Sequence, residues 1–171
     1  DFTGPLMIIQ QGYRVVYEEK AICYEEATIK SKQEFNMRVR VIRGGMTGLI
    51  FAKKILNPLY YPVASLQLIS HKLLRWMVPL LAIFAFITNT IRYFEAPSFY
   101  VSLTLGLQLF FYSLVVLSYF SEKAQYKSRL LNIIQYFFIV NLAALKATYL
   151  VCSRKLEATW EPDRNLSEIV K

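Results

Sequence analysis

Apolar positions divide the chain into a mixed N-terminal part and a strongly apolar C-terminal part. Residues 1–54 combine charged and apolar side chains, whereas Trp76–Ile91 and Ala96–Ser121 carry no charge at all. Uncharged runs of about this length cross the hydrocarbon core of a bilayer as helices. Because the link between the two runs is short, we expect an antiparallel pair of spans at about residues 75–92 and 97–120.

A third apolar run, at about residues 130–150, is interrupted by Asn132, Gln135, Asn141 and Lys146. Its length of roughly 30 Å as a helix is enough to cross. A lysine in hydrocarbon costs at least about 2.5 kcal/mol, however, and a crossing would move the basic residues that follow away from the side of the N-terminal part. We therefore expect this run to lie in the interface or to re-enter.

The N-terminal part predicts an α/β fold. "PLMIIQQGY" is typical of a short helix capped by Gly12, "YRVVYEE" alternates as a strand does, and "AICYEEA" suggests a second short strand. Residues 31–54 then show a helical period. Its apolar face comprises Phe35, Val39, Ile42, Met46, Leu49 and Ile50.

Three glycines lie within this helical stretch, and two prolines follow it. Gly44, Gly45 and Gly48 each weaken a helix by up to about 1 kcal/mol relative to alanine, so they indicate close packing or a break. Pro58 and Pro62 end the helix. Residues 55–73 include "ASLQLISHKLL", in which Leu66, Ile69 and Leu73 share one face, and this pattern favours an amphipathic segment on the bilayer surface.

Charge and composition narrow the choice of partner. The net charge of +8 fits nucleic acid, anionic lipid or a phosphorylated substrate, and the long uncharged runs favour a membrane over nucleic acid. One histidine and the distant Cys23 and Cys152 predict neither a metal site nor a disulfide. The opening "DFTGP" has neither an initiator methionine nor a signal peptide, so we expect a longer protein.

The order of these features resembles the C-terminal half of membrane-embedded family 2 glycosyltransferases, the group of the cellulose, chitin, hyaluronan and poly-N-acetylglucosamine synthases. In that family a catalytic base stands about eleven residues before a Gly-Tyr-Arg-Val turn, the spacing of Asp1 from Gly12. "MRVRVIRGG" overlays the family's Gln-x-x-Arg-Trp motif, with Arg40 on the arginine. Met37 and Val41 depart from the motif, which favours a non-processive transferase, or one with a different acceptor, over a cellulose or hyaluronan synthase.

The resemblance implies the tail of a GT-A nucleotide-sugar domain (residues 1–54), the interfacial segment, a membrane region (74–152) and a polar tail (153–171). It implies transfer from a nucleotide-sugar donor to a saccharide or lipid-linked acceptor at the cytoplasmic face of the membrane. A divalent cation, Mg²⁺ or Mn²⁺, is expected in the whole enzyme, with its ligands outside this chain. Alone, these residues are expected to be inactive.

Arginine chemistry agrees with this interpretation, because glycosyl transfer leaves charge on a diphosphate and guanidinium groups bind phosphate through paired donors. The candidate diphosphate and acceptor-binding residues are Arg38, Arg40, Arg43, Trp160 and Arg164, the last two from "TWEPDR".

Each candidate has a plainer alternative. The arginines of the helix suit lipid headgroups, Trp160 suits an interfacial anchor, and Asp1 is a terminal residue that need have no role. A small basic scaffold subunit that binds anionic lipid or a partner protein is the competing function.

Overall fold

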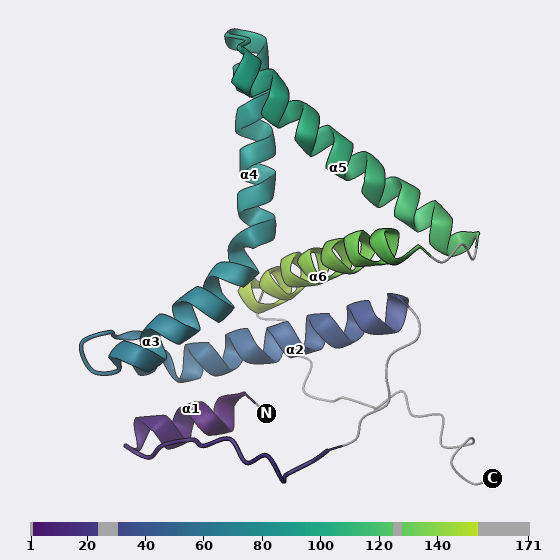
Figure 1. Ribbon diagram of the computed structural model, residues 1–171. Helices are drawn as coiled ribbons and strands as arrows, with labels where there is room; N and C mark the ends of the chain where they lie inside the picture. Colours follow the sequence, from purple (N-terminus) through teal and green to yellow (C-terminus); the bar gives the residue numbers. More distant parts are fainter. Residues whose placement is uncertain (1, 24–30, 125–127, 154–171) are drawn as a thin grey trace, which may run out of the picture.

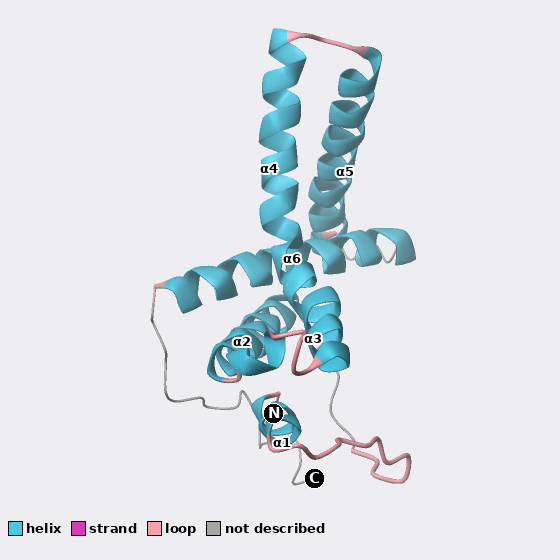
Figure 2. Ribbon diagram, turned by 90° about the vertical axis from the view of Figure 1, so that its left-hand side faces the viewer, coloured by secondary structure: helices cyan, strands magenta, loops and turns pink. Residues whose placement is uncertain are grey.

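The computed structural model describes residues 2–23, 31–124 and 128–153 of the chain. Its α-helices are α1 (Thr3–Gln10), α2 (Ser31–Phe51), α3 (Pro62–Leu68), α4 (Leu74–Glu95), α5 (Phe99–Lys123) and α6 (Arg129–Cys152) (Figure 1). A 3-10 helix, η1 (Lys53–Leu56), follows α2, and a π-helix, η2 (Ile69–Leu73), joins α3 to α4. The described residues form helices and loops, with no strand among them (Figure 2).

The expected α/β fold is therefore wrong for the described part of the chain. Residues 13–23, which include the predicted first strand, are non-helical and pair with no strand among the described residues. Val16 and Tyr17 are 80% and 85% exposed. Most of the predicted second strand lies outside the described residues. An alternating pattern becomes a strand only where a neighbouring strand supplies hydrogen-bond partners, and none of the described segments does so.

The predicted first helix and its glycine cap are confirmed. After α1 the backbone turns through Gly12, whose φ of +87° lies in the left-handed region that glycine adopts most easily. The amide of Gly12 donates to the carbonyl of Ile9 at 3.0 Å, and the amide of Tyr13 donates to Ile8 at 3.2 Å. These bonds satisfy carbonyl groups at the end of the helix, so α1 stops there.

Helices α4 and α5 form the expected antiparallel hairpin, and both ends of the hairpin contact α2. Near the start of α4, the Trp76 ring packs against Gly45. At the end of α5, Glu122 accepts hydrogen bonds from Ser31 of α2 and Gln135 of α6. Figure 2 shows the hairpin rising from the other helices, with its connecting loop at the far end. The N-terminal helices therefore lie at the foot of the hairpin.

Helix α6 runs beside α2 across this foot in both views (Figures 1 and 2). The alanines Ala143, Ala144 and Ala147 are buried against the apolar face of α2. Since alanine has no side chain beyond Cβ, the two helices can pack closely. Val39, Ile42 and Leu49 of α2 belong to the same core.

Three helices are long and apolar enough to cross a membrane, judged by length and composition: 62–95, 99–123 and 129–152. The protein is thus a membrane protein with a bundle of apolar helices. Whether α6 crosses the membrane stays a prediction. The long contact between α6 and α2 is relevant to this prediction. Charged residues along α2 keep that helix near water, and these are Lys32, Glu34, Arg38, Arg40 and Arg43.

Between α2 and α4 the chain makes a compact bend. Pro62 opens α3 at the first helical position, so the second proline begins a helix where we expected both prolines to end one. The Ser65 hydroxyl, fully buried, donates to the carbonyl of Leu56 at 2.8 Å. Of the expected apolar face, Leu66 is 69% exposed, whereas Leu73 packs against the core, to which the buried Leu68 also belongs. The π-helix η2 then carries the chain without interruption into α4.

Candidate functional site

The three candidate arginines of α2 lie on different sides of that helix. Arg40 and Arg43 are three residues apart and share a side, since residues three apart are neighbours on a helix surface. Arg38 stands two residues before Arg40, a step of about 200° around the axis. Both Arg40 and Arg43 are partly buried and make interactions of their own. The structure thus groups Arg40 with Arg43 and sets Arg38 apart.

Arg38 faces α6 and ties the two helices together. Its Nε donates to Glu34 Oε1 at 2.6 Å, one turn earlier on α2. Its guanidinium carbon lies 5.5 Å from the centre of the Tyr136 ring on α6, within the range of a cation–π contact. Burial acts to lower the pKa of Arg38, but the bond to Glu34 and the neighbouring tyrosine outweigh it and raise the pKa. These contacts connect α2 to α6 through Arg38.

The segment that follows Asp1 packs directly on α2. A methyl group added at Gly48 would lie 2.4 Å from Thr3 Oγ1 and 3.6 Å from the Phe2 ring. A methyl group added at Gly45 would lie 3.0 Å from Trp76 Cζ2. The glycines therefore admit close contact with α1 and α4, as the sequence indicated. The added methyl at Gly44, in contrast, meets nothing within 4 Å.

Three of the other candidates fall outside the described residues: Asp1, Trp160 and Arg164. Phe2, the immediate neighbour of Asp1, is nevertheless held against the same helix that carries Arg40 and Arg43. The contact joins the two stretches that the resemblance assigns to the base and to the diphosphate. It brings them together from segments more than 40 residues apart in sequence.

A lysine that the sequence did not single out also reaches this place. Lys72 belongs to the π-helix η2, and its Nζ lies 5.0 Å from the centre of the Phe2 ring. π-Helical turns are rare and occur frequently at functional sites. Sequence periodicity assigned Lys72 to the polar face of an amphipathic helix, and no local motif indicates that it approaches the N-terminal segment.

Among the described residues, no group of histidine, cysteine, aspartate and glutamate side chains is arranged to hold a metal ion. The two described cysteines, Cys23 and Cys152, are free and exposed. Comparisons with protein families, with characterised proteins and with solved structures found no match to this chain. The function must therefore be argued from the residues themselves.

Proposed function

We propose that the chain is the C-terminal part of a membrane-bound inverting glycosyltransferase. The enzyme would move a sugar from a nucleotide-diphosphate sugar to a saccharide or lipid-linked acceptor at the cytoplasmic face. The observation that supports this most directly is the packing of Phe2 and Thr3 on Gly48, which joins the predicted base segment to the arginine helix. The motif order of the sequence supplies the assignment of roles.

In this proposal the carboxylate of Asp1 takes the proton of the acceptor hydroxyl. The acceptor oxygen forms a bond to the anomeric carbon while the bond from that carbon to the diphosphate oxygen breaks. The leaving diphosphate carries away the electron pair and gains negative charge. Inversion follows because attack and departure take place on opposite faces of the sugar ring.

Arg40 and Arg43 are the residues that we assign to the leaving group. They lie three residues apart on one side of α2, so two guanidinium groups can act together on one diphosphate. A guanidinium group donates two parallel hydrogen bonds to phosphate oxygens, and such charge-assisted bonds are about twice as strong as neutral ones. Arg38 is assigned to helix packing, because Glu34 and Tyr136 already engage it.

The divalent cation expected for this reaction class finds no ligand set in the described residues. If the whole enzyme uses one, its ligands come from outside the described residues, and no step above depends on it. What this part contributes is a proton acceptor, positive charge at the leaving group, and attachment to the bilayer.

Asp1→Asn in the full-length protein tests the proposal. The change removes the proton acceptor while keeping the shape, and loss of a general base lowers the rate by roughly 10²- to 10⁴-fold. Transfer of radiolabelled sugar would be measured in membranes, with donor binding measured in parallel and expected to persist. Glu18→Gln, an equivalent change in the exposed loop after α1, is the matched control. Turnover of Asp1→Asn within about tenfold of wild type would refute the assignment.

A further inference from the structure

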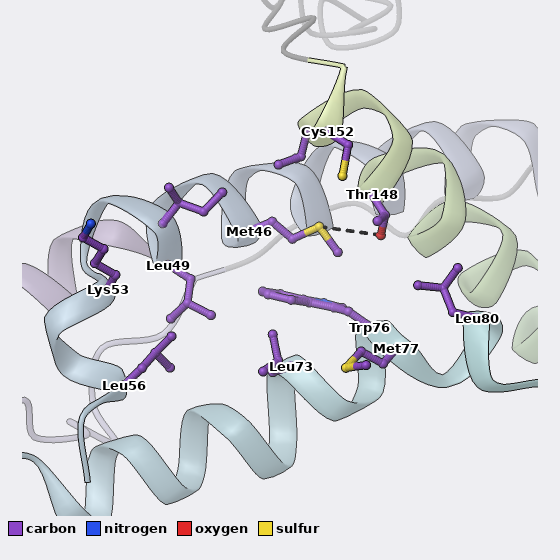
Figure 3. A pocket seen from close by; sticks show the side chains of 12 residues that line it. Met46, Leu49, Lys53, Leu56, Leu73, Trp76, Met77, Leu80, Thr148 and Cys152 are labelled. Carbon is purple, nitrogen blue, oxygen red and sulfur yellow. Dashed lines mark hydrogen bonds between the residues drawn. The ribbon is translucent and has the colours of Figure 1, made fainter. Parts of the chain in front are cut away.

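An apolar pocket of about 400 Å³ lies where α2, η1, η2, α4 and α6 meet (Figure 3). It is lined by Met46, Leu49, Ile50, Lys53, Leu56, Leu73, Trp76, Met77, Leu80, Thr148, Val151 and Cys152. Its volume is within the range of small-molecule sites, and its walls are almost entirely hydrocarbon, sulfur and indole. Cavities with such walls stay dry, so water is not the natural occupant.

The pocket lies at the foot of the membrane hairpin. One wall belongs to the first turns of α4, the helix that rises from the N-terminal helices, and another belongs to the last turn of α6. Figure 3 shows the Trp76 ring lying across the pocket with Leu73 and Met77 below it. Carbon atoms Cζ2 and Cη2 of the same ring pack against Gly45. The pocket therefore lies where the apolar helix α4 begins, beside the N-terminal helices.

Charge at the edge of the pocket is positive. Among the described residues that line the pocket, Lys53 alone is charged. Lys53 is exposed, and Figure 3 shows it at one end of the pocket with its amine pointing away from the apolar side chains. An occupant that satisfies both parts has a long hydrocarbon chain and an anionic head.

We propose that the pocket binds one acyl chain of an anionic glycerophospholipid, with its phosphate at Lys53. This site stands apart from the proposed diphosphate-binding arginines, since neither Arg40 nor Arg43 lines it. The bilayer supplies such lipids at high local concentration. The stretch of chain directly after α6, "SRKLEATWEPDRN", is polar and suits an apolar cavity poorly.

Trp76 provides a direct reporter of occupancy. The chain has two tryptophans, so the background change Trp160→Phe leaves Trp76 as the single fluorophore. Bromine atoms on an acyl chain quench indole fluorescence on contact, and Trp76 is only 5% exposed within the protein. The protein would be reconstituted in phosphatidylcholine vesicles that contain a small fraction of brominated-chain phosphatidylglycerol or, separately, brominated-chain phosphatidylcholine.

We expect the anionic lipid to quench Trp76 at about fivefold lower mole fraction, because one lysine near the surface favours an anionic lipid to that extent. Lys53→Gln should remove this preference. Lys54→Gln is the matched control, since Lys54 is the next residue and does not line the pocket. Excess inorganic phosphate should leave the quenching unchanged, and reversal by phosphate would overturn the lipid assignment in favour of a free anion.

Filling the pocket tests the acyl chain separately from the headgroup. Leu73→Phe with Leu80→Phe enlarges two lining side chains and should reduce quenching by both lipids severalfold. Leu74→Phe with Leu81→Phe adds the same atoms at adjacent positions that are 50% and 51% exposed, and it should leave quenching unchanged. Equal quenching in the filled and control proteins, or an unchanged lipid preference in Lys53→Gln, would overturn the proposal.

Discussion

Gly48→Ala should loosen the contact between α1 and α2. The new methyl carbon would lie 2.4 Å from Thr3 Oγ1 and 3.4 Å from Thr3 Cβ, whereas favourable contacts between carbon atoms lie near 3.5–4.0 Å. Overpacking of this kind costs about 1–3 kcal/mol. Replacing glycine by alanine also stabilises the helix by up to about 1 kcal/mol, because alanine has the higher helix propensity. The net destabilisation is therefore about 0–2 kcal/mol.

Gly44→Ala isolates the packing part of this effect. It makes the same change four residues earlier on the same helix, where the methyl group meets nothing within 4 Å. The propensity gain is common to both variants, so the difference between them is the overpacking cost alone, about 1–3 kcal/mol. Such a difference corresponds to a change of about 5- to 150-fold in an equilibrium constant.

Hydrogen exchange of the α1 amides in detergent micelles measures that equilibrium constant locally. We expect exchange of residues 3–10 to quicken in Gly48→Ala relative to Gly44→Ala, with α5 unaffected. Thr3→Ala should restore protection in the double variant, because it removes the Oγ1 atom that clashes. Thr3 follows the N-cap and the cap makes no side-chain hydrogen bond, so this rescue costs no capping interaction. Equal exchange in the two glycine variants, or no rescue, would refute the packing.

Two further predictions concern the arginines and the topology. Arg40→Lys should lower sugar transfer by more than Arg38→Lys, because a point charge cannot replace the paired donors of a guanidinium at a diphosphate, and Arg38→Lys should instead lower thermal stability. Equal effects on transfer would contradict the division of roles. For the topology, Cys23 and Cys152 should react alike with a membrane-impermeant maleimide in intact cells, tested one at a time with the other changed to serine and with full labelling in detergent as the control. Labelling of one and protection of the other would show that α6 crosses.

Local signals were sufficient for much of the helical architecture. The cap at Gly12, the period of α2 and the uncharged lengths of α4 and α5 depend on residues close together in the chain, so α1, α2 and the hairpin could be predicted. The first strand after Gly12 was predicted wrongly from the same kind of signal. Alternation describes a strand that has a neighbour, and the described residues offer it no partner.

Contacts between distant residues had to come from the tertiary structure. The spacing of Arg38, Arg40 and Arg43 alone could not show that Tyr136, about one hundred residues later, holds the first of them. The sequence indicated close packing at Gly45 and Gly48, but only the fold identified Trp76 and Thr3 as the groups packed there. Periodicity indicates which side of a helix is apolar. The residues that pack against that side depend on how the whole chain folds.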